Sequence, residues 1–294
     1  MGTVVGFISE KGGVGKTTAC YHIAVALGRF YKKRVLVIDA DYQRGGISGR
    51  FFPSLIEKFG STYPGGTTLF NKFQQLYSAS TQTSDIDILN CKDGIGLIPA
   101  DPRLSTVSVD KLPSTNNIKE NNISLLSHMK TISYIINSLN ENYDYVLIDS
   151  HPEVSDVMRS IIYASDFCVS PVKLDRQSSI GVATVIGEIS NVNNDISMIR
   201  KALNIEDDYR DTIFSGAIGM MAREYGEALK QSEQLEYNRL QKSGQMFEAY
   251  VTEGDGLRIA AANRQPVFDI PGSNAAKQAQ QFKDLAQEFM KVCP

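Results

Sequence analysis

Residues 10–18 read Glu-Lys-Gly-Gly-Val-Gly-Lys-Thr-Thr and follow the apolar run Val-Val-Gly-Phe-Ile at residues 4–8. An apolar run, a glycine-rich turn and the start of a helical pattern predict a phosphate-binding loop between a strand and a helix. The glycines allow the backbone to adopt positive φ and to approach a polyphosphate without a Cβ clash. Backbone N–H groups and the first helical turn then form a positive concavity for an anion. The alternative, a glycine-rich turn that binds nothing, is disfavoured by this strand–loop–helix context.

Side chains of this stretch have predicted contacts of their own. Lys16 is expected to reach the β- and γ-phosphates of a nucleotide, and the Thr17 hydroxyl is expected to ligate Mg²⁺. The residues predicted to bind the nucleotide are Lys11, Gly12, Gly13, Val14, Gly15, Lys16, Thr17 and Thr18.

Acidic residues follow two further apolar runs. The run Val-Leu-Val-Ile at residues 35–38 leads into Asp39-Ala40-Asp41, and the run at residues 143–148 leads into Asp149. In open α/β sheets, ligands gather at the carboxyl ends of the strands. Asp149 is therefore expected to hold Mg²⁺, through a water molecule. The alternative for Asp39 and Asp41 is that they cap a helix or a turn.

The composition is that of an ordinary soluble globular protein, with 42% hydrophobic and 21% charged residues in 294. The net charge of −3 gives no overall attraction to nucleic acid, so any DNA contact requires a local basic patch. The four cysteines are far apart and the three histidines are scattered, which predicts free thiols and no metal site built from these residues. Without a signal peptide or a long apolar span, the expected location is cytoplasmic.

Apolar runs alternate with helical patterns along the chain, which predicts an α/β fold with a doubly wound, mostly parallel β-sheet and helices on both faces. Length alone leaves one large domain or two small ones open; we expect a single domain over residues 1–294, with no N-terminal helix-turn-helix domain. The predicted strands are residues 3–8, 35–38, 94–99, 143–149, 167–172 and 213–218. The predicted helices are residues 17–30, 68–77, 123–139, 225–241 and 275–290, with another after Ser178. Residues 105–122 are predicted to form an exposed connection.

The phosphate-binding stretch departs from the general P-loop pattern, because Glu10 stands where that pattern has glycine and Lys11 follows it. The resulting Lys-Gly-Gly-Val-Gly-Lys-Thr-Thr resembles the deviant Walker A motif of the ParA/MinD family of P-loop ATPases. The likeness extends to Asp39-x-Asp41, to the strand ending at Asp149 and to less specific segments at 97–100, 164–172 and 264–276, so it covers nearly the whole chain. Within the family, Asp-Ala-Asp-Tyr-Gln at 39–43 resembles the Asp-x-Asp-Pro-Gln of the ParA-like partition group.

This resemblance implies an ATPase that uses ATP and Mg²⁺ and forms a homodimer when ATP binds. Lys11 would cross to the phosphates held by the partner, so that Lys11, Lys16 and Asp41 are the implied catalytic residues. Asp41 would orient the attacking water, which agrees with the positioning that phosphoryl transfer requires. Thr17, Asp39 and Asp149 are the residues implied in the Mg²⁺ site.

The partition group further implies non-specific DNA binding by the ATP-bound dimer, hydrolysis stimulated by a ParB-type adaptor, and association with the nucleoid. Basic residues of the C-terminal half are the candidate DNA contacts, and the alternative for each of them is a solvated charge on a helix face. No membrane attachment is expected, since residues 282–291 mix acids and bases as an ordinary docked helix does. The candidate DNA contacts are Arg223, Lys230, Arg239, Lys242, Arg258, Arg264 and Lys277.

Two positions depart from the family pattern without removing a phosphate or metal ligand. Tyr42 stands where the family has proline, which loosens the switch turn. His151 replaces the first of two prolines after the Asp149 strand, where a histidine is more often a loop side chain than a catalytic group. The adenine is expected near Met220–Met221 and the Pro266–Pro271 segment.

Two other functions stay open. A metabolic P-loop enzyme that transfers phosphate to a small acceptor would turn over without a partner and without Lys11. A positioning or regulatory ATPase of the same family would act on a protein complex without DNA.

Overall fold

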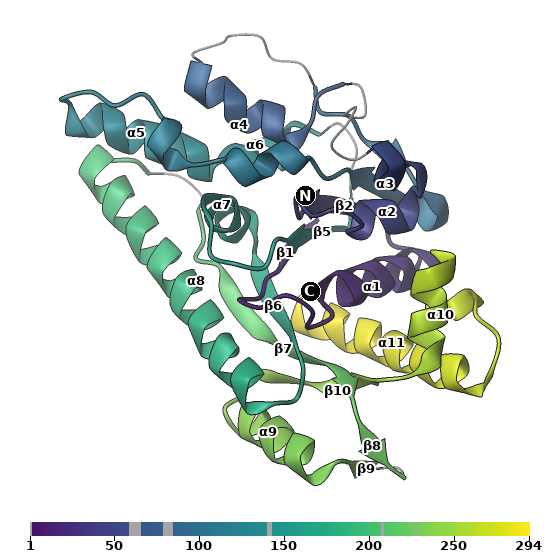
Figure 1. Ribbon diagram of the computed structural model, residues 1–294. Coiled ribbons are helices and arrows are strands. Elements are labelled where there is room, and N and C mark those ends of the chain that lie inside the picture. Colours follow the sequence, from purple (N-terminus) through teal and green to yellow (C-terminus); the bar gives the residue numbers. More distant parts are fainter. Residues whose placement is uncertain (1, 59–65, 79–84, 140–142, 207–208, 227) are drawn as a thin grey trace.

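The computed structural model describes residues 2–58, 66–78, 85–139, 143–206, 209–226 and 228–294. Its centre is an eight-stranded sheet in the order β10-β7-β6-β1-β5-β2-β4-β3 (Figure 1). Every neighbouring pair is parallel except β3 with β4. This sheet confirms the predicted α/β class. The strands are β1 (Thr3–Phe7), β2 (Val35–Ala40), β3 (Leu89–Asn90), β4 (Ile95–Ile98), β5 (Tyr145–Ser150), β6 (Phe167–Val172), β7 (Ile213–Ala222) and β10 (Met246–Thr252).

Helices cover both faces of the sheet, as expected for parallel strands whose apolar runs are continuous (Figure 1). A small separate hairpin consists of β8 (Glu224–Tyr225) and β9 (Ala228–Leu229). The helices are α1 (Lys16–Tyr31), α2 (Ile47–Phe51), α3 (Ser54–Lys58), α4 (Leu69–Ser78), α5 (Ile118–Met129), α6 (Thr131–Ser138), α7 (Asp156–Ala164), α8 (Arg176–Leu203), α9 (Gln231–Lys242), α10 (Asp255–Asn263) and α11 (Ser273–Val292).

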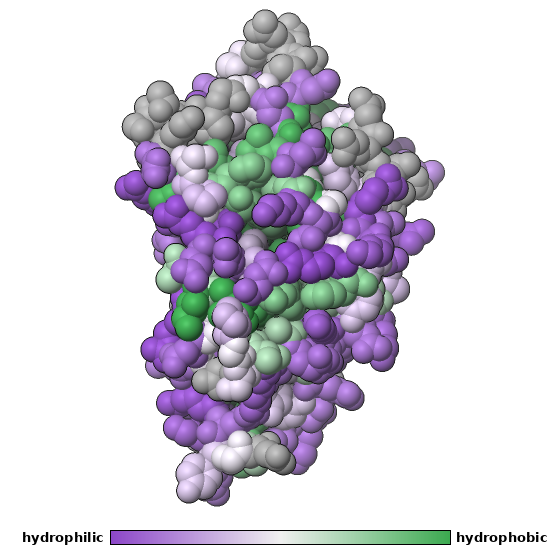
Figure 2. Space-filling model, turned by 90° about the vertical axis from the view of Figure 1, so that its right-hand side faces the viewer, coloured by the Kyte–Doolittle hydropathy of each residue, from purple (hydrophilic) through white to green (hydrophobic). Residues whose placement is uncertain are grey.

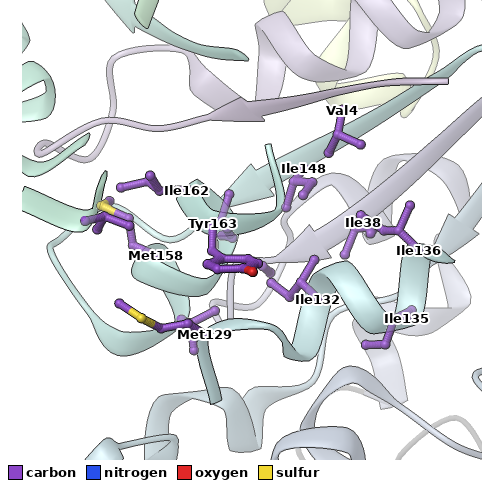
Figure 3. Close-up of a cluster of buried hydrophobic side chains, with 14 of the residues drawn as sticks. Val4, Ile38, Met129, Ile132, Ile135, Ile136, Ile148, Met158, Ile162 and Tyr163 are labelled. Atoms are coloured by element: carbon purple, nitrogen blue, oxygen red, sulfur yellow. The ribbon is translucent and has the colours of Figure 1, made fainter. Parts of the chain in front are cut away.

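Successive strand residues point to opposite faces of the sheet and enter two separate cores. On β1, Val4 belongs to the core formed with α5, α6, α7 and α8, which Figure 3 shows in close-up. Its neighbour Val5 belongs to the second core, which α1 and α11 complete. The two cores bury the apolar side chains of β1, β2 and β5 on both faces of the sheet.

The parallel strands bring several carboxyl ends to one edge of the sheet. In the register of the sheet, Asp39 on β2 lies opposite Asp149 on β5, and Asp149 lies opposite Phe7 on β1. The loop after β1 therefore begins beside both aspartates, although they are 110 residues apart in sequence. This edge positions the candidate site.

Two predicted helices were wrong in their limits. The helix predicted for 225–241 begins only at Gln231, because Gly226 adopts φ 67° and turns the chain into the β8–β9 hairpin. The helix predicted for 123–139 is two helices, α5 and α6, with Lys130 as the residue between them. Since Asn117 caps α5 by accepting a hydrogen bond from the Lys119 N–H, the end of the predicted connection 105–122 is also helical.

The sequence pattern missed several elements: helix α7, the short α2, α3 and β3, the edge strand β10 and the following α10. β10 carries the exposed Glu248 in its apolar run, which obscures the strand signal. The strand is anchored from outside the sheet, since Glu288 of α11 accepts from the N–H groups of Glu248 and Ala249 at 2.7 and 2.8 Å. Long-range contacts therefore define this strand.

The surface on the side of α10 mixes hydrophilic and hydrophobic residues (Figure 2). Within the ranges given above, no helix has the combination of length and apolar character needed to cross a membrane.

Candidate functional site

The loop between β1 and α1 has the backbone that its glycines predict. Gly13 and Gly15 adopt φ of 72° and 91°, which side-chain-bearing residues rarely do. At Gly15, the residue before α1, an added Cβ would also lie 3.1 Å from the Cβ of Met220 on β7. The loop therefore requires glycine at this position for both conformation and space.

A cavity of about 320 Å³ opens above this loop. It brings together all the residues predicted to bind the nucleotide, and Asp41 joins them. Gln43 and Pro152, which the sequence did not predict as nucleotide contacts, also line it. The lining residues are Lys11, Gly12, Gly13, Val14, Gly15, Lys16, Thr17, Thr18, Asp41, Gln43, Pro152 and Met221.

Lys16 lies beneath the loop and pairs with Asp149. Its ammonium group is 3.2 Å from Asp149 Oδ1 and also donates to the Ser150 carbonyl oxygen, and the Lys16 side chain is only 6% exposed. Asp149 is fully buried, and its other oxygen, Oδ2, has no hydrogen-bond partner among the residues described. Burial raises the pKa of Asp149, while the Lys16 charge opposes that rise. An unpaired buried carboxylate oxygen is costly, and it is the kind of ligand that Mg²⁺ accepts.

Asp39 is engaged with its own chain. Oδ2 accepts from the Ser48 N–H at 2.9 Å and from the Ser48 hydroxyl at 2.6 Å, and Oδ1 accepts from the Asp41 N–H at 3.1 Å. Burial raises the pKa of Asp39 to about 7, and the nearby Asp149 carboxylate adds to this rise. Asp39 thus fixes the segment that leads from β2 to α2, and this placement suits a supporting role beside the metal site more than direct ligation.

Asp41 is held by two hydrogen bonds to the same oxygen. Its Oδ1 lies 2.8 Å from His151 Nδ1 and accepts from the Gln43 N–H at 3.0 Å. The His151 ring stacks on Tyr42, with ring centroids 3.8 Å apart and planes inclined by 25°. The two positions that depart from the family pattern therefore contact each other, which sequence reasoning did not foresee.

Lys11 lies at the rim of the cavity and contacts α8. Its ammonium group donates to Gln177 Oε1 at 3.1 Å, on the first turn of that helix.

The comparison with protein families decides the assignment. The AAA_31 model, described as an AAA domain, matches residues 2–205. The chain belongs to the AAA_31 family. The resemblance drawn from residues 10–18 is confirmed, and the chain is a P-loop ATPase of the ParA/MinD type.

Individual relatives are distant from this AAA_31 ATPase. The sporulation initiation inhibitor protein Soj of Bacillus subtilis is 24% identical over 209 residues, covering 70% of this chain and 69% of Soj. Among solved structures, the ATP complex of a Cyanothece McdA variant has a TM-score of 0.71 at 16% identity and covers 98% of this chain and 96% of that one. A putative plasmid partition protein of Borrelia burgdorferi bound to AMPPNP has a TM-score of 0.64 at 21% identity and covers 99% of both chains. At these identities the structures establish the fold.

Candidate protein ligands for Mg²⁺ in this AAA_31 ATPase lie beside the cavity above the loop. In the part of the chain that the structure describes, no three His, Cys, Asp or Glu residues are grouped to hold a metal ion. Mg²⁺ usually keeps several waters and takes one or two carboxylates with substrate phosphates. Thr17 and the unpaired Asp149 Oδ2 meet that requirement beside the cavity above the loop, so the residues present fit the ion.

The seven predicted DNA contacts are dispersed over β7, α9, α10 and α11 and the loops beside them. Four of them lie in ion pairs, which are Arg223–Glu233, Arg239–Glu236, Arg258–Asp255 and Lys277–Glu224. For Lys230, Lys242 and Arg264, the described residues provide no ion pair. Four of the seven positive charges thus lie beside carboxylates, which lowers the local positive charge available for a DNA contact.

The structure of this AAA_31 ATPase also places the segments predicted near the adenine, and the four cysteines. Met221 lines the cavity, whereas the Pro266–Pro271 segment packs on α1, where the Val267 N–H donates to His22 Nε2 at 3.1 Å. The four cysteines, all inside the described ranges, are free thiols, as predicted.

Proposed function

We propose that this chain binds ATP with Mg²⁺ in the cavity above residues 11–18 and hydrolyses it to ADP and phosphate. The observation that carries the proposal is the convergence of Lys11, Lys16 and Asp41 on one cavity, beside the unpaired Oδ2 of Asp149. The backbone N–H groups of the loop and the N-terminus of α1 bind the phosphates. Lys16 exchanges its contact with Asp149 for one with the β- and γ-phosphates.

Thr17 and Asp149 hold the magnesium ion, and Asp39 supports the carboxylate side of that site. The ion supplies neutralisation of the charge on the phosphate oxygens. Asp41 holds the attacking water in line with the γ-phosphate, because phosphoryl transfer depends mainly on positioning. We expect Asp41→Ala to bind the fluorescent analogue mant-ATP as the wild type does but to hydrolyse ATP poorly; wild-type turnover in that variant would remove Asp41 from this role.

ATP binding favours a homodimer in which Lys11 of each protomer contacts the nucleotide of the other. In that dimer the chain binds non-specific DNA, and a ParB-type adaptor stimulates hydrolysis and release. ATP acts as a switch only if it binds the dimer more tightly than the monomer. The protein then works in the cytoplasm on the nucleoid. A relative described as a ParA family protein and the putative plasmid partition protein from Borrelia support this choice within the family.

A gel shift with non-specific duplex DNA tests the partition function. We expect a shift with the non-hydrolysable analogue AMPPNP and Mg²⁺, and none without nucleotide. Lys16→Ala is the matched control, since it should neither bind the analogue nor shift DNA. Because contacts to phosphates release counterions, the shift should weaken steeply as salt increases.

A positioning ATPase that acts on a protein complex without DNA is the second candidate. The pairing of Arg223, Arg239, Arg258 and Lys277 with carboxylates of the same chain favours it. This candidate predicts AMPPNP-dependent dimers that do not shift DNA at low salt. Fast turnover without any partner, unchanged by Lys11→Ala, would instead indicate a metabolic phosphate-transferring enzyme.

A further inference from the structure

Asp41, Tyr42 and His151 form a connected unit at the rim of the ATP cavity. The Asp41–His151 hydrogen bond is 2.8 Å long, and the side chains of His151 and Asp41 are 5% and 9% exposed. At this distance from a carboxylate, His151 Nδ1 carries the proton and donates it. The hydrogen bond is therefore nearly shielded from water, which would otherwise compete for it.

The oxygen that accepts this hydrogen bond determines which oxygen of Asp41 remains available to another donor. His151 Nδ1 and the Gln43 N–H both use Oδ1. The carboxylate plane is thereby held by two donors on one side, and Oδ2 is left to accept a hydrogen bond from water. Asp41 itself lines the ATP cavity, where the proposed reaction needs an acceptor for the attacking water.

Both the ring and the backbone of His151 have contacts within the chain. Tyr42 covers one face of the ring at 3.8 Å. The backbone of the loop is set by the Ser150 hydroxyl, which donates to the His151 carbonyl oxygen at 3.1 Å, and by Pro152, which lines the cavity. Glu153, the next residue, adopts φ 105°, which is uncommon for a residue with a side chain.

We propose that His151 is a positioning residue for hydrolysis, which holds the Asp41 carboxylate in its productive orientation while Tyr42 holds the His151 ring. The inference rests on the proposed function, because it requires Asp41 to align water. Neither position has the proline of the family pattern, so the backbone of the switch turn is freer. The stacked side chains replace that restraint with a contact between the loops after β2 and β5.

The test separates ATP binding from the rate of hydrolysis. Affinity for mant-ATP with Mg²⁺ is measured by fluorescence titration, and hydrolysis is measured in single turnovers with the protein in excess over ATP. We expect His151→Ala to keep its affinity within about twofold and to hydrolyse about tenfold to a hundredfold more slowly, as loss of positioning does. His151→Asn should recover most of the rate, because its amide nitrogen is close to the position of Nδ1 and can donate to Asp41.

Two variants of Tyr42 test whether its stacking on His151 contributes to the rate of hydrolysis. Tyr42→Ala should slow hydrolysis, and Tyr42→Phe, which keeps the stacked ring, should slow it less. His128→Asn is the control for general destabilisation, because His128 is a buried histidine that bonds Tyr77 in the helical layer. It should lower the unfolding temperature without slowing hydrolysis.

The double variant distinguishes this inference from the proposed function. In an Asp41→Ala background, His151→Ala should cause no further loss of rate, because its effect passes through Asp41. If Asp41→Ala itself hydrolyses ATP normally, the proposed function fails. If Asp41→Ala is slow while His151→Ala is as fast as the wild type, or His151→Asn is as slow as His151→Ala, only the positioning role is overturned.

Discussion

The Lys11 ammonium group donates a hydrogen bond to Gln177 Oε1, 3.1 Å away at the start of α8 in the same chain. The lysine that distinguishes the deviant Walker A motif thus has a contact within its own subunit. The acceptor is a neutral amide and the contact is exposed to solvent, so it does not neutralise the ammonium charge as an anionic partner would. A triphosphate in a second subunit offers a stronger contact.

Lys11→Ala should abolish dimers formed with AMPPNP and Mg²⁺ while leaving the monomer folded, because the side chain is at the surface of the cavity and not in either core. Analytical ultracentrifugation with and without AMPPNP measures this. Lys119→Ala, on the exposed face of α5, is the matched control and should dimerise normally. Undiminished dimers of Lys11→Ala would contradict a role for this lysine between subunits.

Lys16→Ala should lose ATP binding and also destabilise the free protein, because it leaves the buried Asp149 carboxylate without its counter-charge. Breaking a buried ion pair costs about 3 kcal/mol or more. In an Asp149→Asn background, the same substitution should cost at least about 1 kcal/mol less. Urea unfolding of the wild type, both single variants and the double variant gives the coupling energy, and strict additivity would show that the two side chains do not interact.

Gly15→Ala should lower the free energy of unfolding by about 1–2 kcal/mol, the cost of a left-handed backbone at a residue with a side chain. The approach to Met220 adds to this cost. Gly12→Ala is the control in the same loop, since Gly12 is not in the left-handed region and its added Cβ would have 3.7 Å to Pro152 Cγ. Denaturation should therefore separate the two variants, and equal stability would mean that the loop relaxes freely around Gly15.

The protein should lose stability on acidification through His22. Burial lowers the pKa of His22 to about 3, and its Nδ1–H donates to the Thr18 carbonyl oxygen at 2.8 Å while Nε2 accepts from the Val267 N–H. The unfolded chain binds a proton at this histidine below about pH 6.5, and the folded chain does so only near pH 3, so acidification favours unfolding. The loss attributable to His22 is about 3 kcal/mol between pH 7 and pH 4.

Urea titrations of the wild type and His22→Gln at each pH isolate this effect from that of the carboxylates. The stability advantage of the wild type should shrink as the pH falls from 7 to 4. A constant difference between the two proteins would show that His22 does not contribute to acid sensitivity.

Much of this protein could be predicted from local patterns. The loop at 10–18 is a contiguous stretch whose glycines, lysine and threonine act together, so no tertiary information is needed to identify it. The strands ending at Asp39 and Asp149 are continuous apolar runs, and such runs predict a sheet buried on both faces. β10 escaped prediction, because its position depends on Glu288 of α11 and on pairing with β7, both distant in sequence.

The sequence by itself determined the phosphate-binding loop, the α/β class and the family, because each depends on residues that are neighbours along the chain or on a short repeat. Only the tertiary structure decided that Asp149 keeps one unpaired oxygen, that Asp39 is occupied with Ser48, and that Tyr42 and His151 stack beside Asp41. The last of these contacts joins residues about a hundred positions apart. It exists because parallel strands bring their carboxyl ends to one edge, where short loops from different strands meet.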